Sequence, residues 1–333
     1  VMDLVDENRI FVKQGLEMLR RTRNLGLKAL IECNHILPEQ LSSYHIGFVL
    51  GPCLNASGRL DTAKRALDLL CAKTKREADI LAGDLKALND SRKELTVQAV
   101  EEAIREIESG GWDKEKVLVV YLPDCHESLA GIVAGRIREK YYKPTIVLTK
   151  AEDGLKGSGR SIDAYHMYEE LARCQHLLTR FGGHKMAAGL SLPEEHWKEL
   201  RYVLNQNAKL TEEDLCPKIA IDMQLPLAYV QEELIEQLSL LEPFGKGNSK
   251  PVFVVNDLEI LNTKILGKNQ NVVKAQVRDS NGNVMDALYF GNVEQFFFFF
   301  FTKKGGKATF TYYPSVNEYQ GRKSLQIAIQ NYR

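Results

Sequence analysis

The chain has 333 residues, 44% of them hydrophobic and 26% charged, and its 44 basic and 44 acidic side chains leave no net charge. This length allows two or three domains with separate cores, and the composition is that of an ordinary globular protein. Zero net charge argues against a protein that coats nucleic acid by bulk electrostatic attraction, so any site for a polyanion must be local. No run of about 20 apolar residues could span a bilayer, so we expect no membrane segment.

The six cysteines lie far apart in the sequence and form no Cys-x-x-Cys pair, which argues against a zinc or redox motif. Reduced thiols in the cytoplasm are the simplest interpretation. The first residue is Val1 rather than Met, and the chain opens in an acidic turn before a helix. We therefore expect a fragment whose N-terminal part is missing.

The first part of the chain, residues 1–72, is predicted to be helical. Apolar side chains recur there at spacings of three and four, which is the period of an amphipathic helix. The helices predicted in this way are residues 10–21, 26–33 and 61–71. Residues 51–60, just before the last helix, are predicted to form a loop.

Two polar residues of this loop have a structural and a functional interpretation. Asn55 could act only as a helix cap, and Arg59 could pair only with a nearby carboxylate such as Asp61. The functional alternative is that Arg59 contacts a phosphate at a domain interface.

A single long helix is predicted between Thr74 and Gly110. The pattern Thr74-x-x-Glu77 is a capping box, and Gly110 and Gly111 are the next breakers. A helix of roughly 35 residues would be about 50 Å long, which is more than a small domain needs. We therefore predict a connector between two domains.

An α/β pattern follows the connector. Residues 117–121 and 145–148 are short apolar runs suited to buried strands, and residues 128–140 between them are amphipathic. This order predicts a parallel pair of strands joined by a helix. A further amphipathic segment, residues 193–209, is expected to close the domain.

The most informative part of this domain carries two glycine-rich groups of hydrogen-bond donors. In the first, residues 157–161, Ser158 and Arg160 flank Gly159 and point the same way on an extended chain, which suits a phosphate held by two donors. Glycines let a backbone approach a ligand closely, although most glycine turns only reverse the chain. The pair of groups is much rarer than either group alone.

The second group is Gly182-Gly183-His184, within residues 181–189. We expect a loop here, in which His184 reaches whatever the glycines approach and donates to a phosphate. The alternative is a surface histidine with a purely structural environment.

His126 and Glu127 resemble the start of an H-E-x-x-H metalloprotease motif, but Ala130 stands where the second His is required. His126 is instead expected near the C-terminal end of the first strand, where open α/β sheets place ligands. The sequence has no Asp and His cluster spaced to hold two divalent metals and no Ser-His-Asp arrangement beyond chance. Its candidate residues bind phosphates but do not cleave them.

From about Cys216 the pattern becomes that of a small β-domain after a short helix at residues 231–241. The predicted strands are residues 252–255, 272–277, 284–290, 307–313 and 325–329. Five strands fit a closed barrel of the oligonucleotide-binding (OB) type, and a five-stranded sandwich fits nearly as well. The run of phenylalanines at 296–301 fits no periodic pattern, which suggests a low-complexity loop or a sequence error.

Six motifs together resemble the RecJ family of single-stranded-DNA-specific exonucleases, in the DHH phosphoesterase superfamily. In chain order they are residues 51–60, 88–92, 131–134, 157–161, 181–190 and 243–248. The resemblance covers essentially the whole chain. It implies an α/β fold with four parts: a C-terminal remnant of the DHH domain (1–72), a long connecting helix (73–110), an α/β DHH-associated domain (111–215) and an OB-fold domain (216–333).

The resemblance also implies roles for individual residues. Ser158 and Arg160, with Arg59, would hold the 5′-terminal or neighbouring phosphates, and the loop ending at His184 would contact the substrate near the scissile bond. The substrate-binding set expected on this basis is Asn55, Arg59, Ser158, Gly159, Arg160, Gly182, Gly183 and His184, with His184 also the catalytic candidate. The barrel would grip single-stranded DNA, with possible stacking by Tyr289, Phe290, Tyr312 and Tyr319.

The sequence departs from the family at its start, because the acidic metal ligands and the Asp-His-His triplet are absent. Residues 127–130 also replace a version with Pro and Gly, which weakens a shared role for His126. We therefore expect Mn²⁺ or Mg²⁺ only in the full-length protein, with none bound by this chain alone. A monomer and helicase or single-strand-binding partners are further expectations.

Two other functions remain open at this point. One is a scaffold that binds single-stranded nucleic acid without hydrolysis. The other is a smaller DHH-type phosphodiesterase that acts on short oligonucleotides, although the barrel after residue 216 argues against it.

Overall fold

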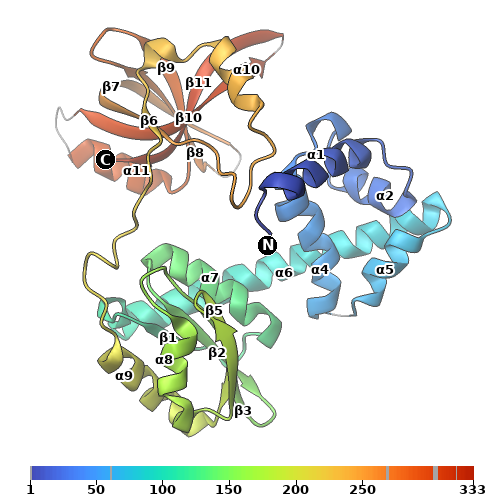
Figure 1. Cartoon of the computed structure of the whole chain (residues 1–333), viewed down its shortest axis with the longest axis vertical. Coiled ribbons are helices and arrows are strands. Elements are labelled where there is room, and N and C mark those ends of the chain that lie inside the picture. The colour runs from blue at the N-terminus through green and yellow to red at the C-terminus, as the bar shows by residue number, and fades with distance from the viewer. Residues whose placement is uncertain (1, 61, 268–269, 303–306, 320) are drawn as a thin grey trace. The chain divides into compact units, whose positions relative to one another are not determined.

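The computed structural model describes residues 2–60, 62–267, 270–302, 307–319 and 321–333, and the chain divides into two compact units (Figure 1). The first unit contains residues 1–18 and 219–333, and the second contains residues 19–218. Helix α1 (Asp6–Arg20) begins in the first unit and ends in the second. No helix among the described residues is both long and apolar enough to cross a membrane.

The second unit starts with short helices that pack against the first half of α6 (Lys75–Ser109). These short helices bury Leu30 and Leu69 in one core with Leu85 of α6. In chain order they are α2 (Leu25–Cys33), a 3₁₀ turn (Pro38–Gln40), α3 (Ser43–His45), a π-helical turn (Ile46–Leu50), α4 (Gly51–Leu60) and α5 (Lys64–Cys71).

The loop predicted over residues 51–60 is wrong, because this segment is helix α4. Its Cys53, Ala56 and Ser57 are buried, and the Ser57 hydroxyl donates to the Leu54 carbonyl at 3.1 Å. Gly, Pro, Asn and Ser favour turns locally, but burial of one face against α6 overrides that preference. The helix predicted over residues 61–71 is confirmed as α5 from Lys64 onward, and Asp61 lies outside the described residues.

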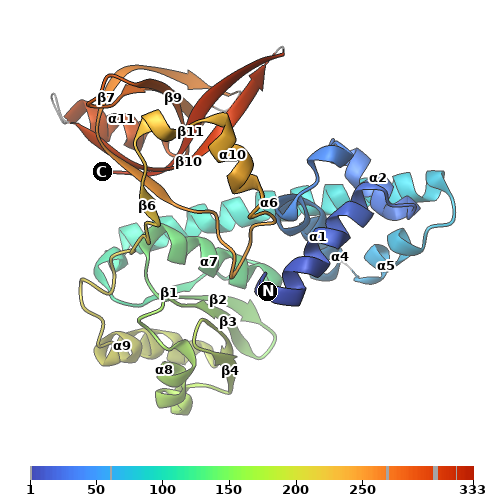
Figure 2. The ribbon, with the colours of Figure 1, turned by 45° about the horizontal axis from the view of Figure 1, so that its top comes forward.

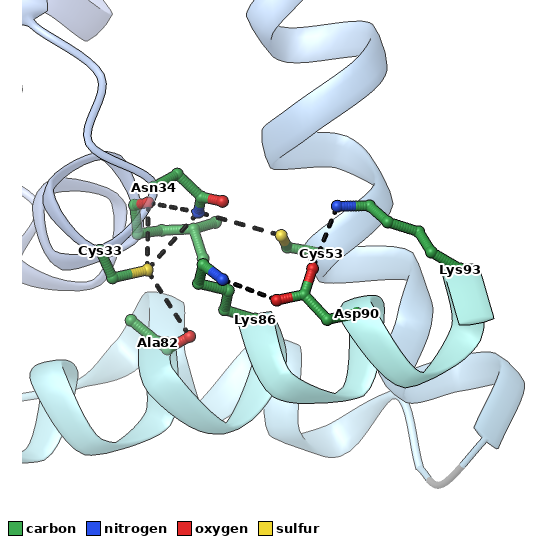
Figure 3. Close-up of polar contacts among 8 residues, drawn as sticks. Cys33, Asn34, Cys53, Ala82, Lys86, Asp90 and Lys93 are labelled. Atoms are coloured by element: carbon green, nitrogen blue, oxygen red, sulfur yellow. Dashed lines mark hydrogen bonds and ion pairs between the residues drawn. The ribbon is translucent and has the colours of Figure 1, made fainter. Parts of the chain in front are cut away.

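Two cysteines take part in polar contacts that link α2 to α4 and to α6 (Figure 3). The Asn34 amide lies 3.5 Å from Cys33 Sγ and 3.9 Å from Cys53 Sγ, and Cys33 Sγ lies 3.8 Å from the Ala82 carbonyl of α6. Burial is the main cause that raises the pKa of both thiols; the charge of Cys53 raises the pKa of Cys33 further, and the charge of Asp90 raises that of Cys53. Cys53 is buried in the core that these helices share with α6, and Cys33 packs against that core, so the pair contributes to packing.

The long helix is confirmed: α6 has 35 residues. The Thr74 hydroxyl accepts from the Glu77 amide at 3.2 Å, as a capping box requires. The Glu77 carboxylate, however, accepts from the Lys73 amide rather than from Thr74, so only half of the box forms. The second half of α6 buries Ala103 and other residues under the α/β sheet.

The α/β part contains a five-stranded sheet in the order β1-β2-β3-β5-β4. As predicted, β1 and β2 are parallel, and the other neighbours are antiparallel. The strands are β1 (Leu118–Tyr121), β2 (Thr145–Ala151), β3 (Gly154–Arg160), β4 (Arg180–His184) and β5 (Ala187–Leu192).

Helices cover this sheet from both sides. Figure 2 shows α7 (Ala130–Tyr141) and α6 on one side, and α8 (Met167–Arg173) and α9 (Trp197–Asn207) on the other. Two separate cores result. On one side α6 and α7 cover Leu118, Val120 and Val147 of β1 and β2. On the other side α8 and α9 cover residues of β1, β2, β3 and β5. On the first face the buried apolar side chains come from β1 and β2, and α7 also packs against β3.

The first unit contains a barrel, as predicted. Its sheet has the order β10-β11-β9-β8-β7-β6, and β10 also pairs with β7, which closes it. Helix α10 (Glu232–Ser239) precedes most of the strands. The strands are β6 (Met223–Gln224), β7 (Phe253–Leu266), β8 (Val272–Arg278), β9 (Val284–Phe290), β10 (Ala308–Tyr319) and β11 (Arg322–Tyr332), so β7 is much longer than expected.

The phenylalanine run is neither a loop nor a strand, because it lies in helix α11 (Val293–Thr302). Phe296 is fully buried and stacks on Tyr289 with ring centroids 4.9 Å apart, whereas Phe298 is 71% exposed. A helix can bury one side of such a run in the barrel core and expose the other. The side chain of Phe301 lies outside the described residues.

The motif at residues 243–248 forms a turn that receives the start of the chain within the same unit. The Leu4 amide donates to the Lys246 carbonyl at 2.6 Å. A Cβ on Gly245 would lie 2.6 Å from Leu4 Cδ1, and one on Gly247 would lie 2.8 Å from Asp3 Cβ. These glycines are therefore required by chain packing.

Candidate phosphate-binding site

Strand β3 separates the first glycine-rich group into two faces. A Cβ on Gly157 would lie 2.6 Å from Leu148 Cδ2, and one on Gly159 would lie 3.1 Å from Met167 Sδ. Both glycines thus face the core under α8 and α9. Their lack of a side chain serves packing, and the binding role expected for Gly159 stays a prediction.

Ser158 and Arg160 lie together on the opposite face, as predicted from their spacing. Both approach Gly131 in the first turn of α7, where a Cβ would lie 2.5 Å from Arg160 Nη2 and 3.5 Å from Ser158 Oγ. The Arg160 guanidinium also donates to the Gly159 carbonyl at 2.7 Å. A hydroxyl and a guanidinium side by side are suitable donors for one phosphate group.

Arg160 lies in a cluster of positive charges. Burial lowers its pKa most, and the charges of Arg138 and Arg59 lower it further. Burial also lowers the pKa of Arg92, again with a contribution from Arg59. Arginine stays charged at neutral pH despite such shifts, so mutual repulsion in this cluster favours a bound anion.

Within the described part of the chain, Arg59, Arg92 and Arg160 form no ion pair with a carboxylate. Their partners are neutral oxygens: the Ser128 carbonyl at 2.6 Å, the Asn89 side chain at 3.0 Å and the Gly159 carbonyl. Arg92 and Arg138 are not among the predicted site residues. Arg92 belongs to the motif at residues 88–92, whereas nothing in the local sequence distinguishes Arg138 from an ordinary surface residue.

Arg59 links the helical and α/β parts of the second unit. It lies on α4 and donates to the carbonyl of Ser128, which is in the short turn before α7. Asn55 is exposed on α4 four residues before Arg59, a spacing that places both side chains on one face of the helix. The structure thus places Arg59 near Arg160, and it records no polar contact for the Asn55 side chain among the described residues.

The second glycine-rich group is a strand and not the predicted loop. Gly182 and Gly183 pair with Gly189 and Ala188, so they extend the sheet as part of β4. A Cβ on Gly182 would have no atom within 4 Å, which leaves bare backbone at this point. The exposed His184 donates from Nδ1 to the Ala187 carbonyl at 2.9 Å, so Nε2 is the nitrogen that can meet a ligand.

A groove of about 500 Å³ joins the two groups. Ser158 and Gly182 both line it, as do the basic residues Lys156 and Arg180. Its other lining residues are Glu127, Ser128, Ala130, Thr149, Gly157, Phe181, Gly189, Leu190 and Ser191. The two segments singled out in the sequence therefore contribute to one surface depression.

His126 has a structural role in this region. It precedes a 3₁₀ turn (Glu127–Leu129), and its Nδ1 lies 2.8 Å from the Ser128 hydroxyl and accepts from the Ser128 amide at 3.3 Å. The first strand ends at Tyr121, so His126 follows it at some distance in the sequence.

The aromatic residues proposed for stacking in the barrel have different environments. Tyr312 is fully buried and its hydroxyl donates to the Leu225 carbonyl at 2.6 Å, so its stacking role is wrong. Tyr289 packs on Phe296 in the core, whereas Phe290 is 63% exposed and stays a candidate. The side chain of Tyr319 lies outside the described residues.

The described residues contain no group of three or more His, Cys, Asp or Glu side chains placed to hold a metal ion. Divalent metals in phosphodiester hydrolysis need such oxygen and nitrogen ligands. The candidate site thus consists of hydroxyl, guanidinium and imidazole groups, with no metal-ligand group among the residues that the structure describes.

Two family models match the chain. Residues 114–210 match the DHHA1 domain, and residues 221–331 match the RecJ OB domain. The first match covers the sheet with Ser158, Arg160 and His184, and the second covers the barrel.

Curated relatives are similar over nearly the whole chain. The single-stranded-DNA-specific exonuclease RecJ of Bacillus subtilis is 35% identical over 99% of the chain and 42% of its own length. The protein of the same name from Haemophilus influenzae is 36% identical over 99% of the chain and 59% of its own length. The chain thus spans about half the length of these relatives.

Solved structures of exonucleases match the chain as well. The crystal structure of RecJ in complex with Mn²⁺ from Thermus thermophilus matches the whole chain with a TM-score of 0.84 and 26% identity, covering 47% of that protein. A crystal structure of exonuclease RecJ bound to manganese matches 61% of the chain with a TM-score of 0.53 and 30% identity.

Proposed function

Because this chain belongs to the RecJ family of the DHH phosphoesterase superfamily, we propose that it is the substrate-binding part of a 5′ to 3′ exonuclease. The full-length protein would hydrolyse single-stranded DNA in repair and recombination, in the cytoplasm. The observation that carries this proposal is the pairing of Ser158 and Arg160 beside arginines that have no carboxylate partner among the described residues.

In this proposal the Ser158 hydroxyl and the Arg160 guanidinium hold the 5′-terminal phosphate. A terminal phosphate carries about two negative charges and three free oxygens, so it uses more donors than an internal phosphodiester does. This difference favours attack from a 5′ end. Arg59 adds a positive charge, and Nε2 of His184, exposed at the end of β4, would contact the substrate near the bond that is cut.

Mn²⁺ or Mg²⁺ would serve the full-length protein. The described residues do not fit such an ion, since they offer no cluster of suitable ligands, so its ligands would come from a part of the protein outside this chain. The role of this chain is then to bind and orient the strand. A monomer, and a helicase or a single-strand-binding protein as partner, belong to the same proposal.

A binding scaffold without hydrolysis is the second candidate, and the absence of a metal-ligand group among residues 2–60, 62–267, 270–302, 307–319 and 321–333 favours it. The reading frame that precedes Val1 separates the two. Acidic metal ligands and an Asp-His-His triplet there would support the exonuclease, and their absence would leave only the scaffold.

The proposal predicts that this chain binds DNA but does not cut it. We expect fluorescence anisotropy to show binding of a 5′-phosphorylated single strand and much weaker binding of a blunt duplex of the same sequence. In the same buffer with Mn²⁺, we expect no release of nucleotides from the single strand. Robust Mn²⁺-dependent hydrolysis by the chain would contradict the division of roles, and equal binding of duplex would contradict the single-strand preference.

A further inference from the structure

The groove continues past Ser158 to a second set of donors. In the sheet register, Ser158 pairs with Gly189 and Gly189 with Gly182, whereas Lys156 pairs with Ser191 and Ser191 with Arg180. Residues two apart on a strand share a face. Lys156, Ser191 and Arg180 therefore form a row on the same face as Ser158, and all three line the groove.

Arg180 is the available cation of this row. Lys156 is paired with the Glu127 carboxylate at 2.7 Å, which neutralises the one acidic side chain lining the groove. Arg180 is exposed and takes part in no ion pair or side-chain hydrogen bond among the described residues. The neighbouring Ser191 supplies a hydroxyl. Gly182 belongs to the adjacent row with Ser158 and Gly189, and it leaves that part of the groove without side-chain atoms.

The spacing of the rows suits a nucleic-acid backbone. Arg160 lies four residues after Lys156 on β3, and Lys156 is in the same row as Arg180. Because a strand rises about 3.3 Å per residue, Arg160 is about 13 Å along the sheet from the row of Arg180. A mononucleotide held by its phosphate at Arg160 cannot place a second phosphate in the far row. A longer strand that runs along β3 can, since single-strand grooves follow the backbone with a series of cations.

We propose that Arg180 and Ser191 form a second phosphate subsite, which holds an internal phosphodiester of the strand whose 5′ phosphate lies at Ser158 and Arg160. This inference rests on the proposed function, because it needs the strand to begin at that site. The end of the groove at Arg180 and Ser191 then binds the sugar-phosphate backbone of the DNA and not a base.

The test measures dissociation constants of 5′-phosphorylated mono-, di- and trinucleotides for the chain and for Arg180→Gln. We expect the variant to bind the mononucleotide as tightly as the wild type does and the trinucleotide about tenfold more weakly. The dependence of log K on log salt should become shallower for the trinucleotide, because one charge contact with a phosphate is lost. Thermal unfolding checks that Arg180→Gln is folded.

Lys150→Gln is the matched control. Lys150 is exposed on β2 and pairs with Leu155 of the core face, so it lies on the opposite face one residue from the Arg180 row, and it should change neither the affinity nor the salt slope. Equal trinucleotide affinity for the wild type and Arg180→Gln overturns the subsite. A weaker affinity with an unchanged slope overturns the phosphate assignment. Failure of the wild type to bind any of the three ligands overturns the proposed function itself, whereas the other two outcomes leave it standing.

Discussion

The two glycine-rich segments of the α/β sheet carry the same signal in the sequence but for opposite physical reasons. Gly157 faces the core, where a Cβ would collide with Leu148 and Leu190. Gly182 faces the groove, where a Cβ would meet nothing within 4 Å. In the first segment the proposed binding groups are the side chains of Ser158 and Arg160, which alternate with the glycines, and in the second Gly182 itself leaves open space above the strand. A glycine motif thus indicates that some group lies close to the backbone, but it does not show whether that group is a core side chain or a ligand.

The largest expected effect follows from the core-facing glycine. Gly157→Val would insert a branched side chain against Leu148 Cδ2 at 2.6 Å and Leu190 Cδ2 at 2.9 Å, so we expect a loss of about 3 kcal/mol in the free energy of unfolding. Urea denaturation followed by circular dichroism measures it. A loss below about 1 kcal/mol would contradict the assignment of Gly157 to core packing.

A smaller effect, on binding rather than stability, is expected at the groove-facing glycine. Gly182→Val should keep the unfolding free energy of the wild type, because its side chain enters open space on a strand that tolerates valine. The same side chain should obstruct the groove and weaken binding of a 5′-phosphorylated single strand about tenfold, or about 1.4 kcal/mol. If both the DNA affinity and the stability of Gly182→Val equalled those of the wild type, Gly182 would not be part of the DNA-binding site.

Much of the fold could be predicted from periodicity. Helix α6 and the buried strands β1 and β2 follow from apolar spacing, whereas the short strands after residue 216 predicted a barrel or a sandwich, and the pairing of β10 with β7 decides for the barrel. The shared face of Ser158 and Arg160 follows from the alternation of side chains on an extended chain. These features depend on local sequence, which is why they could be found without a structure.

The predictions that were wrong concern features that depend on contacts between residues far apart in the sequence. Residues 51–60 contain turn-forming residues, yet burial of Cys53 and Ala56 against α6 makes them helix α4. Gly182 and Gly183 form a strand because β5 offers a pairing edge. Arg138 joins the arginine cluster through the packing of α7, to which its own sequence neighbours give no clue.

The most direct test of the account concerns the 5′ phosphate. Fluorescence anisotropy would give the dissociation constants of one single-stranded oligonucleotide, with and without its 5′ phosphate, for the wild type and for Arg160→Ala. We predict that the wild type binds the phosphorylated strand at least tenfold more tightly. Arg160→Ala should lose about 1 to 3 kcal/mol of binding to that strand and little to the unphosphorylated one, because only the terminal phosphate meets this side chain. Equal affinity of the wild type for both strands would contradict a terminal-phosphate site at Ser158 and Arg160.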